Sequence, residues 1–74
     1  MITPFNRDPE EIYTSLIMDD QNPVLLRFRY RQEATRFQQE FYTGLEEHNV
    51  YIHSEVRYLP SVEYKETIVL TFWR

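Results

Sequence analysis

Three arginines, Arg27, Arg29 and Arg31, alternate with apolar and aromatic residues near the middle of the chain. A guanidinium group forms paired hydrogen bonds with carboxylates and phosphates and also stacks on aromatic rings. Successive side chains of a strand point to opposite faces, so a strand over residues 24–31 places all three arginines on one face. This spacing predicts a surface that binds a partner.

Two later stretches are expected to add aromatic and basic side chains to the same face. The predicted contact residues are Arg27, Arg29, Arg31, Tyr51, His53, Arg57 and Trp73. Arginine beside tyrosine and tryptophan is typical of binding hot spots in protein interfaces. The same mixture binds single-stranded nucleic acid, in which bases stack on aromatic rings. A third possibility is an ordinary solvated face with cross-strand ion pairs, such as Glu55 with Arg29 or Lys65.

The residues needed for catalysis or metal binding are sparse. His48 and His53 are five positions apart across an expected helix-to-strand junction, which matches no common metal-ligand spacing. The chain contains no cysteine, and Gly44 is its single glycine, so neither a thiol nucleophile nor a phosphate-binding glycine loop is available. We therefore expect no enzyme activity, no cofactor and no metal site.

The segment from Gln32 to His48 is predicted to be the central helix, because apolar residues recur at three- and four-residue steps. These residues are Ala34, Phe37, Phe41 and Leu45. The start of this helix is weakly marked, and a capping box of Thr35 with Gln38 is the best candidate.

A shorter helix is predicted to begin at Asp8, which is a favoured N-cap residue followed by Pro9 at the first helical position. The inward positions of this helix are expected to be Ile12 and Leu16, joined by Tyr13 and Ile17. Ile2 and Phe5, which precede it, are apolar enough to pack on the core. A turn at 21–23 follows the helix, since proline removes a donor and restricts the preceding residue.

Residues 24–31, 50–59 and 62–72 alternate between apolar and polar side chains and are predicted to be strands. Pro60 and Ser61 mark a turn that makes the last two strands antiparallel. The order is thus helix, strand, helix, strand, strand. We expect an α+β domain with both helices on one face of a three-stranded sheet, and with the last strand, the most apolar, at its centre. If that strand instead lies at an edge, it offers a route to homodimerisation.

Composition limits the remaining possibilities. Seventy-four residues make a single domain, spanning 1–74, that buries about 60% of its unfolded surface. A net charge of −4 disfavours general affinity for nucleic acids or anionic membranes. The first residues lack the basic and apolar regions of a signal peptide, and no apolar run is long enough to span a bilayer, so we expect a cytoplasmic protein.

These observations favour a non-enzymatic protein-protein interaction module, a small regulator or inhibitor of a larger macromolecule. Short aromatic-rich domains of this type are common among phage and mobile-element proteins. The alternative is binding of single-stranded nucleic acid through the arginine and aromatic face. A protein partner is expected, and no membrane partner.

Overall fold

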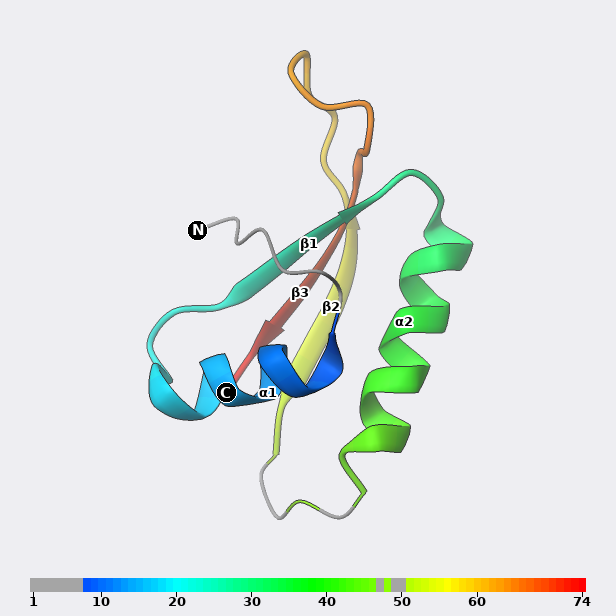
Figure 1. The fold of residues 1–74 in the computed structure, drawn as a ribbon. Coiled ribbons are helices and arrows are strands. Elements are labelled where there is room, and N and C mark those ends of the chain that lie inside the picture. The colour runs from blue at the N-terminus through cyan, green and yellow to red at the C-terminus, as the bar shows by residue number, and fades with distance from the viewer. Residues whose placement is uncertain (1–7, 47, 49–50) are drawn as a thin grey trace.

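The computed structural model describes residues 8–46, 48 and 51–74. Its elements are α1 (Pro9–Met18), β1 (Val24–Phe28), α2 (Arg31–Gly44), β2 (His53–Tyr58) and β3 (Ile68–Trp73). The strands form one antiparallel sheet in the order β1-β3-β2, and both helices pack on the same face of it (Figure 1). The predicted α+β architecture and the central place of the last strand are confirmed. The edge strands are therefore β1 and β2, and the last strand has no free edge through which two copies could pair.

The start of α1 is confirmed. The Asp8 carboxylate accepts a hydrogen bond of 3.0 Å from the Glu10 amide, and proline occupies the first turn. Ile12 and Leu16 are completely buried, as their spacing predicts. Ile17 was expected to face inward but is 38% exposed, because it lies beyond the stripe that the sheet and α2 can cover. The predicted packing of Ile2 and Phe5 falls outside the described residues.

The second helix is shorter than the predicted 32–48. It ends at Gly44, and the amide of the C-cap residue Leu45 donates to the Phe41 and Tyr42 carbonyls. The capping box at Thr35 is wrong, since this residue lies inside the helix and its hydroxyl donates to carbonyls of the preceding turn. The predicted buried stripe is confirmed for Ala34, Phe37, Phe41 and Leu45.

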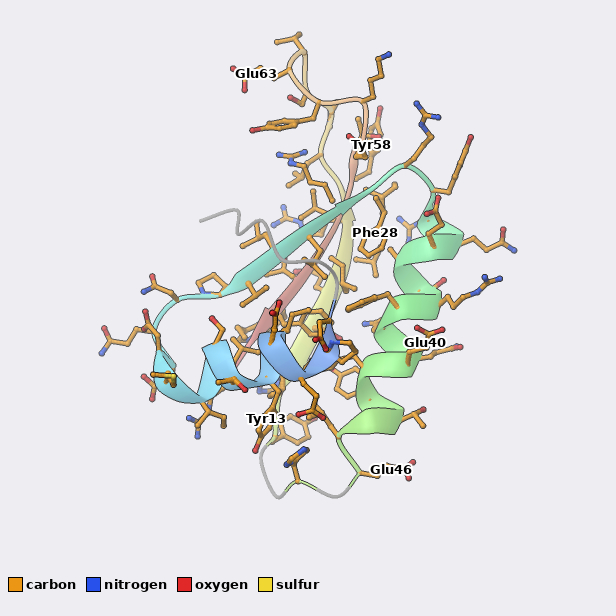
Figure 2. The ribbon with its side chains drawn as sticks, in the orientation of Figure 1. Tyr13, Phe28, Glu40, Glu46, Tyr58 and Glu63 are labelled. Atoms are coloured by element: carbon orange, nitrogen blue, oxygen red, sulfur yellow. The ribbon has the colours of Figure 1, made fainter. Side chains whose placement is uncertain are left out.

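One hydrophobic cluster joins both helices to the covered face of the sheet. Its strand members are Val24, Leu26, Phe28, Ile68, Leu70 and Phe72. The rings of Phe41 and Phe72 lie 4.2 Å apart, and Phe28 lies between the sheet and α2 with its ring 5.9 Å from that of Phe37 (Figure 2). Each large aromatic ring buries far more apolar area than an average core side chain, which suits so short a chain.

All three strands are shorter than predicted. The first ends at Phe28, so Tyr30 does not face the core and is 60% exposed at the N-cap of α2. The last begins at Ile68, and Val62, the first residue of the predicted strand, is fully exposed. The second covers only residues 53–58 of the predicted 50–59. Alternation alone cannot mark where pairing stops, because hydrogen-bonding partners decide it.

The connection between β2 and β3 is longer than a tight turn at Pro60. The Leu59 amide donates to the Thr67 carbonyl at 2.8 Å, which extends the ladder by one pair beyond β2. Further out, the Ser61 hydroxyl accepts hydrogen bonds from the amides of Glu63 and Tyr64. This loop projects past the end of the sheet, with Glu63 near its tip (Figure 2).

Candidate protein-binding face

The sheet face opposite the helices, here called the open face, is determined by the strand register. Its members are Leu25, Arg27, His53, Glu55, Arg57, Val69, Thr71 and Trp73. The residues next to them in each strand belong to the helix-covered face or its rim. Because successive side chains of a strand point to opposite faces, these eight side chains point away from the helices. The face therefore mixes aromatic, basic and acidic groups across all three strands.

Four of the seven predicted contact residues lie on the open face. They are Arg27, His53, Arg57 and Trp73. Tyr51 lies two residues before the start of β2 and is 78% exposed. Arg29 and Arg31 are not part of the sheet, because β1 ends at Phe28 and Arg31 is the first residue of α2. The expected row of three arginines on one strand face is therefore wrong, since the chain turns after Phe28 to bring α2 over the sheet.

An aromatic row occupies one end of the open face. His53 and Trp73 are direct partners on neighbouring strands, and their rings stack with centroids 5.5 Å apart and planes inclined by 16°. The ring of Tyr51 meets His53 edge-on at 4.7 Å. Trp73 is 36% exposed. We call these three residues, Tyr51, His53 and Trp73, the aromatic row.

Two hollows flank Trp73. One, of about 450 Å³, is lined by Asp20, Gln21, Pro23, Glu55, Arg57, Thr71, Trp73 and Arg74. The other, of about 360 Å³, is lined by Tyr42, Leu45, Tyr51, Ile52, His53, Ser54 and Trp73. The indole thus forms a ridge between a charged hollow and a more aromatic one. Sequence reasoning missed the contribution of residues 20–23, which tertiary packing alone brings beside the final strand.

Arg27 has a structural role at the other end of the open face. Its guanidinium lies 4.2 Å from the centre of the Tyr64 ring, and Nη1 donates to the Glu66 carbonyl at 3.2 Å. Its cross-strand neighbour Val69 is only 1% exposed, although it points away from the helices. The β2–β3 loop therefore engages Arg27, and the accessible part of the face lies toward the aromatic row.

The ion pairs considered for a plain solvated face do not match the register. Glu55 lies opposite Thr71, and β3 separates it from Leu25 of β1. Arg29 follows the end of β1, and Lys65 lies in the β2–β3 loop before β3 begins. Neither basic residue is therefore a cross-strand neighbour of Glu55.

The two histidines serve different parts of the molecule. His48 stacks on Tyr13 of α1 at 4.1 Å, whereas His53 belongs to the aromatic row. Across residues 8–46, 48 and 51–74, no group of three or more histidine, cysteine or acidic side chains is placed to hold a metal ion. Within the same ranges, no helix combines the length and the apolar character needed to cross a membrane.

No protein-family model, curated protein or solved structure matches the chain.

Proposed function

We propose that the chain is a non-enzymatic protein-binding module that regulates or inhibits a larger protein, with the aromatic row and Arg57 as its main contact. The observation that carries this proposal is the partly exposed indole of Trp73, which stacks on His53 and separates two hollows. Tryptophan, tyrosine and arginine are the residues most enriched at interface hot spots.

Preorganisation supports the aromatic row as a contact. Stacking on His53 restricts the rotation of the Trp73 side chain before any partner arrives. Immobilising a flexible side chain at an interface costs about 0.5–1.5 kcal/mol of entropy. A side chain that is already held in its bound rotamer avoids part of that cost. The two hollows beside the indole are places where partner side chains can insert.

The charges around Trp73 favour a protein over a phosphate backbone. The larger hollow contains the acids Asp20 and Glu55 as well as the bases Arg57 and Arg74. A nucleic-acid groove is positive throughout, because it follows a row of phosphates. A protein surface with both signs of charge and an apolar anchor complements this hollow better.

Affinity capture from a lysate of the native cells, with and without nuclease, tests the proposal. We expect a stoichiometric protein partner that the wild type retains after nuclease treatment and that a Trp73→Ala variant loses. The matched control is Tyr30→Ala, which removes an exposed aromatic ring at the start of α2. Loss of the recovered material after nuclease, together with an affinity that falls steeply with salt, would instead establish nucleic-acid binding.

A further inference from the structure

The outer edge of β2 presents backbone groups to solvent. In an antiparallel pair, residues that exchange hydrogen bonds alternate with residues whose N–H and C=O point away from the partner. Leu59 is bonded to Thr67, so the bonded positions of β2 are the odd ones, 53, 55 and 57. The N–H and C=O groups of Ser54, Val56 and Tyr58 therefore point away from β3.

Only the first part of this edge is occupied within the described chain. The Tyr42 hydroxyl donates to the Ile52 carbonyl at 2.9 Å and lies 2.7 Å from the Ser54 hydroxyl. Among residues 8–46, 48 and 51–74, no backbone hydrogen bond outside the ladder involves residues 54, 56 or 58. The strand also lacks the proline or lysine that commonly blocks an edge.

We propose that β2 of one chain pairs antiparallel with β2 of a second copy, around a twofold axis at Val56. The two three-stranded sheets then become one sheet of six strands. In this register Val56 faces Val56 of the second copy, and Ser54 faces Tyr58. All three outward positions form ladder hydrogen bonds.

Charge complementarity selects this register. Glu55 and Arg57 are both exposed and both on the open face. With the axis at Val56, Glu55 of each chain lies directly opposite Arg57 of the other, where side chains are about 4.5–5.5 Å apart at Cβ. Moving the axis by one residue places two copies of Glu55, or two copies of Arg57, opposite each other. Like charges in that position are destabilising.

The other edge lacks this complementarity. The backbone groups at the odd positions of β3 form hydrogen bonds with β2, so those at its even positions form hydrogen bonds with β1. In β1 the even residues are therefore bonded to β3, and the backbone groups that point away from the sheet belong to Leu25 and Arg27. A twofold axis at Leu26 pairs Leu25 with Arg27, an apolar residue with a charged one. The self-complementary edge is therefore β2.

Pairing through β2 also covers an exposed aromatic ring. Tyr58 is 61% exposed, although it points to the side of the sheet that carries the helices. In the dimer it lies beside Ser54 of the second copy, whose hydroxyl accepts from Gln38 Nε2 at 2.6 Å. Both aromatic rows then lie on one face of the six-stranded sheet. The proposal does not depend on whether that face binds another protein.

Reciprocal charge reversal tests the dimer. Sedimentation equilibrium of the wild type is expected to show twice the 9.2 kDa chain mass, in a proportion that rises with concentration. Glu55→Arg alone sets two arginines opposite each other across the axis, and Arg57→Glu alone sets two glutamates opposite each other. Each variant should therefore dimerise at least about tenfold more weakly than the wild type. In the mixed dimer that forms when the two variants are combined in equal amounts, both contacts pair an arginine with a glutamate. The charge repulsion is therefore removed, and the mixture should dimerise.

The matched controls are Glu40→Arg and Arg36→Glu, which make the same charge changes on exposed positions of α2 and should leave dimerisation unchanged. Recovery in the mixture also shows that both single variants are folded. A wild type with the mass of one chain at concentrations up to about 1 mM would overturn the proposal. So would a mixture that associates no better than its components.

Discussion

The imidazole of His53 lies against the indole of Trp73, with the ring centroids 5.5 Å apart. The two residues are far apart in the sequence, yet the β2–β3 register makes them direct neighbours. This contact holds the indole between a hollow beside the α1–β1 turn and a second hollow that Tyr42 and Leu45, at the end of α2, also line. Because His53 orients the indole in this way, substitution of Trp73 is the most direct test of partner binding at the open face.

Replacing Trp73 with alanine should weaken binding of the captured partner by more than about 1 kcal/mol, because a preoriented aromatic anchor is lost. Tyr51→Ala should have a similar effect. Isothermal titration calorimetry measures both affinities, with Tyr30→Ala as the control and circular dichroism to verify the fold. If both variants bind like the wild type, the interface lies on the helices instead.

Phe41→Ala should lower the free energy of unfolding by about 3–5 kcal/mol, because its ring is completely buried against Phe72. Such a loss is a large share of the stability of a small domain. Urea denaturation followed by tryptophan fluorescence measures the change. Val62→Ala removes apolar atoms from a fully exposed position and should leave the urea concentration at the midpoint of unfolding unchanged. Equal stability of the two variants would contradict the core described here.

Tyr42→Phe should lower the free energy of unfolding by about 1 kcal/mol, since it removes the hydroxyl that joins α2 to the Ile52 carbonyl and the Ser54 hydroxyl. Tyr30→Phe is the matched control, because Tyr30 lies exposed at the N-cap of α2. Thermal and urea unfolding of both variants provide the comparison. No difference between them would mean that water replaces these hydrogen bonds without cost.

A double-mutant cycle of Arg27→Ala and Tyr64→Ala should give a coupling energy of about 0.5–1 kcal/mol, because the guanidinium lies over the ring. The cycle is needed since Arg27 also donates to the Glu66 carbonyl. Urea unfolding of the four proteins measures the coupling. A parallel cycle with Glu63→Ala in place of Tyr64→Ala should give none. Strict additivity in the first cycle would show that the loop does not depend on this contact.

Local sequence signals predicted the elements whose stability depends on nearby residues. Asp8 followed by Pro9 marks the start of α1, since an N-cap acts through a hydrogen bond two residues away. The spacing of Ala34, Phe37 and Phe41 identifies the buried face of α2, because helical periodicity is a local property. The order of the strands followed from chain direction and from the apolar character of residues 68–72.

The ends of the strands depended on distant partners, so alternation could not locate them. Arg29 and Arg31 continue the pattern of β1 in sequence, but the ladder ends with the pair of Phe28 and Ile68. The loop before Ile68 takes Tyr64 to the guanidinium of Arg27, which the pattern had assigned to a binding surface.

Residue types along the chain thus determined a helix-covered sheet with an aromatic and basic open face. Only the tertiary structure decided which of those side chains meet. The stack of His53 on Trp73 and the hollow beside Asp20 come from strand register and from the packing of the α1–β1 turn beside the last strand. Contacts between residues far apart in sequence depend on how the whole chain folds, and no local sequence pattern specifies them.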